Sequence, residues 1–405
     1  MIIGIDASRA FLKRRTGIEE YAYQTIKHLR TCISPTDTVI LYVRRKISWE
    51  KGRIRFVVPE IDFSLPNNWH VRGVWAPRFW TQIALSLEML FHTPDVLFVP
   101  AHTVPLIHPA HNATFLYSSV ALFVRKIFHK ASSCTFEHSV AGGPKKTIVT
   151  IHGLEYEFCK ESYAFLDRLY MRLSIRFSCR VASTVICVSE NTKRDVMKLY
   201  SVPEKKIQVI YEGYEQQSTE NSQQRTKKQT SPYLLFIGRL EERKNIVRMI
   251  EAFEILKKKY VIPHILVLAG KPGYGYDQIR YKLQATSHKL DIKELGYISE
   301  EEKWALFKNA DVFLFPSLYE GFGIPVLEAQ SVGVPVVTSD IASLPEVGGA
   351  GAIYIDPLNA ESLAEGIYRV ISDKQQRDDI IAKATENVRR FSWQKCADDI
   401  HVLFS

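Results

Sequence analysis

The sequence has no C-x-x-C pair, no apolar run of about 20 residues, no basic stretch at its start and no clear D-x-D pair. Its six cysteines are scattered without framework spacing, which favours reduced thiols over disulfides or a cysteine zinc site. Without a long apolar run, membrane contact is expected to be peripheral. Residues 1–6 have the pattern of a first buried strand rather than a signal peptide, so we expect a cytoplasmic protein.

Length and charge allow several kinds of partner. A chain of 405 residues is long enough for two ordinary domains, and 46% hydrophobic with 24% charged residues is typical of folded proteins. The net charge of +9 favours nucleic acid, an acidic membrane or phosphorylated small molecules, although solubility alone explains it equally well. A nucleic-acid site would need stacking aromatics within a basic stripe, and no such layout is present.

Short apolar runs alternate with amphipathic stretches along the whole chain. Most of the runs are apolar on both faces, as in strands of a covered parallel sheet. The pattern predicts an α/β protein with doubly wound, Rossmann-like sheets. The predicted strands are 2–5, 39–43, 96–99, 147–151, 184–188, 207–210, 233–237, 265–269, 312–315 and 334–338, and the clearest helices are 19–30, 192–200 and 245–258.

A polar stretch divides the chain. Residues 216–231 read QQSTENSQQRTKKQTS and contain no apolar side chain, so they are predicted to be a linker between domains 1–215 and 232–388. Residues 389–405 form a last helix with Ser392 as N-cap. Ligands of such sheets bind beyond the carboxyl ends of the strands, so a site is expected where the two halves face each other.

Residues 106–143 are long for a plain connection within the first half. Apolar and aromatic residues are mixed there with Arg125, Lys126 and Lys130, a composition that suits a helix at a membrane interface. The alternative is a helical insertion that packs on its own domain.

The segment 317–328, which reads SLYEGFGIPVLE, carries two carboxylates, Glu320 and Glu328. Gly321 and Gly323 allow a tight turn and a close approach to a ligand, and Pro325 fits the first turn of a helix. The free N–H groups of that helix start would point at an anion. The segment therefore suits a sugar nucleotide, with hydroxyls at both ends and a diphosphate between them. Alternatively, Glu320 only complements the helix dipole.

A basic loop follows the predicted strand 233–237. Gly238 permits close approach, Arg239 offers a planar fork of donors and Lys244 a point charge, all suited to diphosphate oxygens. By itself this is an ordinary basic loop, but its pairing with Glu320 and Glu328 in the same half favours a binding site.

With these motifs the chain resembles the retaining GT-B glycosyltransferases of the family 4 type, in a bacterial mannosyltransferase-like branch. The resemblance covers nearly all of the second half and is looser in the first. The matching segments are 238–244, 269–275, 295–298, 310–317, 320–328, 333–337 and 344–349, with 16–18, 150–153 and 188–190 in the first half.

The resemblance implies a role for each motif residue. Arg239 and Lys244 would hold the donor diphosphate and stabilise the charge of the leaving group. Glu328 would accept hydrogen bonds from the ribose, and Glu320 from the transferred sugar. Further donor-binding residues are Gly17, Gly238, Ser317, Gly321, Phe322 and Gly323.

His152 would face the donor sugar in such an enzyme. The family commonly has Asp after this histidine, whereas this chain has Gly153, a departure that changes how the imidazole is oriented. A hydrogen-bonded structural histidine is the alternative. His102, His108 and His111 have irregular spacing that does not favour a metal site.

The resemblance predicts the GT-B fold, with two Rossmann-like domains facing each other and the C-terminal helix crossing back to the first. The expected enzyme is a retaining hexosyltransferase that moves mannose from a nucleotide-diphosphate donor, of GDP-mannose type, to a lipid-linked or polysaccharide acceptor in surface glycan or lipopolysaccharide synthesis. No cofactor or metal is expected, because cations aimed at the leaving phosphate can stabilise it. The alternatives are a GT-B nucleotide-binding scaffold without transfer and a sugar-nucleotide epimerase.

Overall fold

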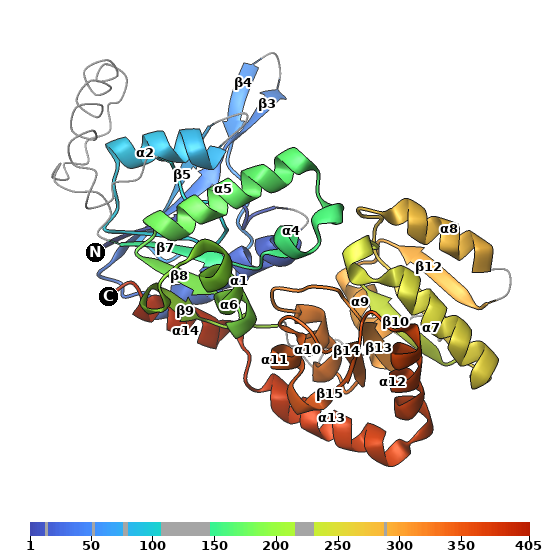
Figure 1. Cartoon of the computed structure of the whole chain (residues 1–405). Coiled ribbons are helices and arrows are strands. Elements are labelled where there is room, and N and C mark those ends of the chain that lie inside the picture. The colour runs from blue at the N-terminus through green and yellow to red at the C-terminus, as the bar shows by residue number, and fades with distance from the viewer. Residues whose placement is uncertain (13–14, 51–52, 76–79, 107–145, 215–230, 287–289) are drawn as a thin grey trace.

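The computed structural model describes residues 1–12, 15–50, 53–75, 80–106, 146–214, 231–286 and 290–405. Two parallel sheets, each covered by helices, form two domains in sequence order, with the helices and sheet of the second half below and to the right of the first in Figure 1. The doubly wound α/β architecture predicted from the sequence is therefore confirmed.

The first domain is built on a seven-stranded sheet in the order β5-β2-β1-β6-β7-β8-β9, with all neighbours parallel. Its strands are β1 (Ile2–Asp6), β2 (Thr38–Arg44), β5 (Trp69–Val74), β6 (Val96–Val99), β7 (Lys146–Ile151), β8 (Thr184–Cys187) and β9 (Ile207–Val209), and β3 (Lys46–Glu50) and β4 (Arg53–Val57) form a separate antiparallel hairpin. Its helices are α1 (Gly17–Cys32), η1 (Trp80–Leu85), α2 (Ser86–Phe91), α4 (Glu155–Phe158), η2 (Lys160–Ser162), α5 (Phe165–Val181), α6 (Glu190–Tyr200) and η3 (Glu204–Lys206).

The second domain has a six-stranded parallel sheet in the order β12-β11-β10-β13-β14-β15. Its strands are β10 (Tyr233–Ile237), β11 (Ile265–Ala269), β12 (Ile292–Gly296), β13 (Val312–Phe315), β14 (Val336–Ser339) and β15 (Ala352–Ile355). Its helices are η5 (Glu242–Lys244), α7 (Ile246–Lys259), α8 (Tyr276–Thr286), α9 (Glu300–Asn309), α10 (Ile324–Ser331), α11 (Leu344–Gly348), η6 (Gly349–Gly351), α12 (Ala360–Ser372) and α13 (Lys374–Val388).

The last helix, α14 (Trp393–Val402), crosses back and packs on the first domain beside α1 (Figure 1). The Trp393 ring lies edge-on to Tyr21, with 6.0 Å between the centroids, and Phe404 packs near Phe98. Ser392 caps the helix, because its Oγ accepts the N–H of Lys395 at 3.1 Å. The predicted N-cap and the crossing are both confirmed.

Sequence patterns missed three edge strands, β5, β12 and β15, although the edge strand β9 was predicted at 207–210. β5 and β12 are edge strands with several exposed side chains, so they lack the continuous apolar run that marked the central strands. The strand predicted at 334–338 is found at Val336–Ser339, after Pro335, which has no N–H to donate to a ladder.

Two predicted segments lie outside the described residues. The linker 216–231 falls almost entirely within 215–230, and the insertion 106–143 within 107–145, so its contact with a membrane stays a prediction. Among the residues that are described, no helix combines the length and apolarity needed to cross a bilayer.

Candidate active site

Glu320 lies in the loop after β13 and is held by two cations from the loop after β10. Its carboxylate pairs with the Lys244 ammonium, and Arg243 Nη1 lies 2.9 Å from its other oxygen. Burial would raise the pKa of Glu320, but the charges of Arg243 and Lys244 outweigh it and lower the pKa to about 2. Glu320 is therefore ionised, and as a carboxylate it can accept hydrogen bonds from hydroxyl groups.

Asn245 fixes the loop that carries these cations. Its backbone is left-handed, with φ of 62°, and it ends the 3₁₀ turn η5 just before α7. Its buried amide donates to the carbonyl oxygens of Pro316 at 3.1 Å and Pro357 at 2.7 Å. The loops after β10, β13 and β15 are thus tied together, which holds Lys244 against Glu320. Burial, together with the charge of Arg243, lowers the pKa of Lys244.

Arg239 has a different environment from Lys244. It is exposed, just beyond Gly238 at the end of β10, and within the described ranges it forms no ion pair. Its aliphatic stem passes close to Gly273, where an added Cβ would lie 2.6 Å from its Cγ. The structure therefore brings Lys244 to Glu320 and leaves the Arg239 guanidinium open to a ligand.

Glu328 is in the second turn of α10 and is buried. Lys303 of α9 donates to its Oε1 at 2.8 Å and also reaches Glu300 at 2.6 Å. Burial would lower the pKa of Lys303, but the charges of Glu328 and Glu300 outweigh it and raise that pKa. Each of the two predicted carboxylates is thus held by a lysine.

The loop between these carboxylates is held by the first domain. The Gly321 carbonyl oxygen accepts from Ser189 Oγ at 2.8 Å and from Thr192 Oγ1 at 3.2 Å. A Cβ at Gly321 would clash with the His152 carbonyl oxygen. The Phe322 ring packs among first-domain aromatics, 6.1 Å from Tyr211.

The start of α10 is shaped within the second domain. Gly323 is the N-cap, with φ of 121°, a conformation that favours glycine, and Pro325 is in the first turn as predicted. Ser343 Oγ donates to the carbonyl oxygens of Glu320 at 2.9 Å and Phe322 at 2.7 Å. The Ser317 hydroxyl is buried, and among the described residues its oxygen has no hydrogen-bond partner.

The second domain also caps helix α6 of the first domain. Glu346, at the start of α11, accepts the N–H groups of Glu190 at 2.7 Å and Asn191 at 3.2 Å. A carboxylate at a helix N-terminus is favoured by the free N–H groups and the helix dipole. The contact therefore helps to hold α6 against the C-terminal domain.

The ring of His152 is turned into its own domain. Nε2 lies 3.0 Å from the Pro100 carbonyl oxygen, which can only accept, and Nδ1 lies 2.9 Å from Glu212 Oε1. The ring is also edge-on to Tyr21 and to His102. Both nitrogens are therefore engaged within the first domain, and only the main chain of His152 meets the loop at Gly321.

Gly153 stands where the family commonly has the Asp of a His-Asp pair, and its surroundings leave little room for a side chain. An added Cβ there would lie 3.1 Å from Gly321 Cα and 2.9 Å from Glu155 Oε2, so a side chain would crowd the contact between the domains. The carboxylate that orients His152 comes instead from Glu212, after β9.

Gly17 is the first residue of α1 and is exposed, and an added Cβ would meet nothing within 4 Å. The fold therefore does not require glycine there. Of the three histidines considered for a metal, only His102 is described, and burial holds its pKa well below the usual range. The described residues contain no group of three or more ligands suited to a metal.

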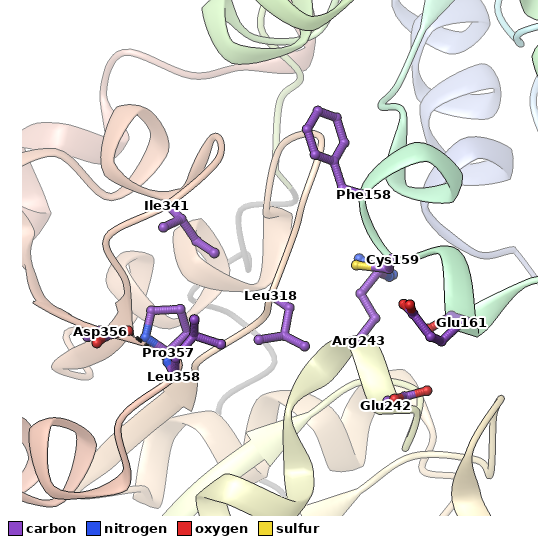
Figure 2. A pocket seen from close by; sticks show the side chains of 11 residues that line it. Phe158, Cys159, Glu161, Glu242, Arg243, Leu318, Ile341, Asp356, Pro357 and Leu358 are labelled. Carbon is purple, nitrogen blue, oxygen red and sulfur yellow. Dashed lines mark hydrogen bonds between the residues drawn. The ribbon is translucent and has the colours of Figure 1, made fainter.

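A pocket of about 300 Å³ lies between the domains, beside Arg243 (Figure 2). Phe158, Cys159, Glu161 and Ser162 line it from the first domain. The second domain lines it with Glu242, Arg243, Leu318, Ile341, Asp356, Pro357 and Leu358. Figure 2 shows Arg243 beside Cys159 and Glu161, across from Ile341 and Pro357.

Sequence reasoning missed three charged residues of this region, Arg243, Lys303 and Glu212. Arg243 directly precedes Lys244, so its position in the basic loop was a usable signal. Lys303 is 25 residues from Glu328 in the sequence, and Glu212 is 60 residues from His152. No local spacing predicts these contacts.

Two family models together span most of the chain. Residues 15–217 match the model described as Glycosyltransferase Family 4, and residues 217–387 match Glycosyl transferases group 1. The two matches meet at residue 217.

Curated relatives carry the same assignment. O-antigen chain mannosyltransferase B of Escherichia coli is 30% identical over 260 residues, covering 62% of this chain and 68% of its own. An uncharacterized glycosyltransferase of Methanocaldococcus jannaschii is 30% identical over 347 residues, 82% of this chain and 83% of its own. O-antigen chain mannosyltransferase RfbU of Salmonella typhimurium is 28% identical over 272 residues, 66% of this chain and 71% of its own.

Solved structures share the fold over the full length. WaaG, a glycosyltransferase involved in lipopolysaccharide biosynthesis, superposes with a TM-score of 0.66 at 13% identity, covering 100% of both chains. Anabaena HepE, in complex with UDP and glucose, gives 0.65 at 17% identity, covering 99% of this chain and 98% of its own. The chain therefore belongs to the family 4 glycosyltransferases of GT-B fold, in their mannosyltransferase-like branch, and is a hexosyltransferase.

Proposed function

We propose that the protein transfers mannose, with retention and without a metal, from a GDP-mannose-type donor to a lipid-linked or polysaccharide acceptor of a surface glycan. The observation that carries the proposal is the cluster of Glu320, Lys244 and Arg243 beside the start of α10. The named mannosyltransferases among the relatives support the choice of sugar.

The ion pairs suggest how the donor is received. Lys244 is buried against Glu320, and Lys303 against Glu328. A diphosphate reaching Lys244 and Arg239 would compete with Glu320 for the ammonium, and would free that carboxylate to accept hydrogen bonds from sugar hydroxyls. The Glu328 carboxylate, beside Lys303, would accept hydrogen bonds from the ribose. The 300 Å³ pocket contains Glu161, Glu242 and Asp356, so we place the diphosphate at Arg239 and Lys244, which do not line that pocket.

The chemistry is a substitution at the anomeric carbon. The bond from that carbon to the diphosphate oxygen breaks, and a bond to an acceptor hydroxyl oxygen forms on the same face. The acceptor proton passes to the leaving diphosphate. Arg239 and Lys244 stabilise the charge that builds on that group, the kind of preorganised stabilisation that is worth most in transition states. His152, through its main chain beside Gly321, borders the sugar.

A panel of nucleotide sugars tests the proposal. The purified chain is incubated with each donor, with and without a mannosylated lipid acceptor, and free nucleoside diphosphate is measured. Release from GDP-mannose that requires the acceptor, persists in EDTA and yields an α-linked product is the expected result. Binding without release would instead support a nucleotide-binding scaffold, and a changed sugar without release would support an epimerase.

The expected location follows from the acceptor. A lipid-linked acceptor would bring the enzyme to the inner face of the cytoplasmic membrane as a peripheral protein, and the net charge of +9 suits an anionic surface.

A further inference from the structure

The outward face of α5 exposes more large apolar side chains than is usual for a surface in contact with water. Phe165 and Leu166 are 72% and 73% exposed, and Leu173 is 59% exposed. Leu169 and Tyr170 are exposed on the same helix. Single exposed apolar residues are common, but five on one helix face mark a surface that contacts something else.

A row of arginines runs along the same helix. Arg168, Arg172, Arg176 and Arg180 follow one another at intervals of four, so they lie one above the other with a slow drift around the helix. Arg172 pairs with Glu157, with Nε 2.6 Å from Oε1. Arg176 and Arg180 are exposed, and neither forms an ion pair with any residue in the described ranges.

The neighbouring helices extend this surface. The Gln82 amide of η1 donates to the Tyr170 hydroxyl at 2.7 Å, which sets η1 beside α5. Helix α2, which follows η1, lies next to α5 in Figure 1. Ile83 and Leu87 on these helices are also exposed, at 52% and 42%. We call the exposed residues of α5 with Ile83 and Leu87 the α5 face.

We propose that the α5 face binds an anionic lipid surface. Apolar side chains of Leu, Phe and Tyr beside unpaired arginines are what an interfacial helix presents to headgroups and to the acyl boundary. Arginine side chains can lay their stems over apolar surface and keep the guanidinium at the phosphates. The helix has one acid, Asp167, against four arginines, so a second copy of this face would bring like charges together.

Such docking would orient the enzyme. Phe165 begins α5 only three residues after Ser162, which lines the pocket between the domains. A bilayer against the α5 face would therefore lie near that pocket. The inference deepens the proposed membrane location. The benefit of docking rests on the proposed lipid-linked acceptor, whereas the binding of the α5 face to lipid does not depend on it.

Sedimentation of the full chain with vesicles tests the proposal. Phosphatidylcholine vesicles with and without phosphatidylglycerol are compared, and binding is expected to need the anionic lipid and to weaken with salt. The double variant R176Q/R180Q should lower the partition coefficient by roughly 30-fold, about fivefold for each lost charge. L169S/L173S should weaken it as well, while the charge-matched control K258Q/K308Q on exposed lysines of the second domain should bind like wild type.

Three results would overturn the proposal. Equal sedimentation of R176Q/R180Q and wild type would remove the role of the arginines. Unchanged vesicle binding with a lower melting temperature in L169S/L173S would mean that the chain covers this face itself. A halved solution mass of L169S/L173S, with no vesicle binding by wild type, would show a contact between copies. Transfer to a water-soluble acceptor is measured on the same variants, and it should stay at the wild-type rate, so that a failure of docking is distinguished from a failure of the proposed function.

Discussion

The α-carbon of Gly321 lies against the carbonyl oxygen of His152, at a point where no Cβ fits between the two domains. The contact joins the loop that carries Glu320 to the end of β7. Ser189 and Thr192 hold the same loop through the Gly321 carbonyl oxygen. The position of the carboxylate therefore depends on how closely the two domains approach.

Gly321→Ala should separate closure from folding. The new methyl group would meet the His152 backbone in the other domain, whereas Gly321 has an ordinary backbone conformation that alanine can adopt. We expect kcat/KM to fall at least about tenfold, because displacements near 1 Å at a reacting centre can cost a hundredfold, with little change in melting temperature.

Gly333→Ala is the matched control for this variant. Its φ of 75° strains an alanine, but the added Cβ would meet nothing closer than 3.8 Å and does not face the first domain. It should lose about 1–2 kcal/mol of unfolding free energy and keep its turnover. Equal activity losses in the two variants would refute the role given to the Gly321 contact.

Arg239→Ala and Lys244→Ala should differ in stability and agree in activity. Both remove a cation proposed to hold the diphosphate, so turnover should fall by about 10² to 10³ in each. Arg239 is exposed and unpaired among the described residues, so its removal should leave the unfolding free energy unchanged. Lys244→Ala leaves Glu320 with one cation fewer and should lower the unfolding free energy by about 1–3 kcal/mol. Steady-state kinetics measure the turnover of both variants, and urea unfolding measures their stability. Wild-type turnover in Arg239→Ala would exclude Arg239 from the site.

The positions of the central strands along the chain and the two carboxylates were predictable because their signals are local. Apolar runs mark strands buried on both faces, and Glu320 and Glu328 stand on one short segment with its glycines and proline. The partners of these carboxylates were not equally predictable. Arg243 and Lys303 reach them from other loops and helices, and only the order of the strands in the sheet brings those elements together.

The orientation of His152 shows the same limit more sharply. Its sequence neighbour Gly153 indicates that the usual acidic partner is missing, but nothing nearby points to Glu212, 60 residues away. The edge strands β5 and β12 were missed for a related reason, since exposed side chains interrupt their apolar pattern.

Gly17→Ala tests whether the start of α1 approaches the donor. The added Cβ has no protein atom within 4 Å, and alanine is the better helix former, so the melting temperature should stay the same or rise slightly. If the backbone meets the donor phosphate or the acceptor there, KM should rise by about tenfold or more, a cost of about 1.4 kcal/mol in binding. Unchanged kinetics would leave Gly17 without a role at the site.

Glu212→Ala should disturb the ring of His152. The pair is nearly buried, with side chains 10% and 6% exposed, so loss of the acceptor leaves Nδ1 without its partner. We expect the unfolding free energy to fall by about 1.5–3 kcal/mol, the range for hydrogen bonds to charged groups, and turnover to fall as well. Glu212→Gln keeps an oxygen in place and should recover most of the stability; identical losses in Ala and Gln would show that the hydrogen bond is not the cause.

Stability should depend on acid through Glu320. The cations beside it hold its pKa at about 2 in the folded chain, against 4.5 as its ordinary value. Because the unfolded state binds the proton first, the contribution of Glu320 is complete above about pH 4.5 and is lost as pH falls towards 2. The shift corresponds to roughly 3 kcal/mol. Residue 320 cannot titrate in the Glu320→Gln variant, so this variant should be less stable than wild type near neutral pH, and the difference should shrink steadily below pH 4.5.

Urea unfolding of the wild type and of Glu320→Gln, between pH 7 and the lowest pH at which each still folds, measures that difference in unfolding free energy. Glu361→Gln, which replaces an exposed carboxylate on α12, is the control. A difference that is constant with pH would mean that the charge of Glu320 contributes nothing to holding the loops after β10 and β13 together.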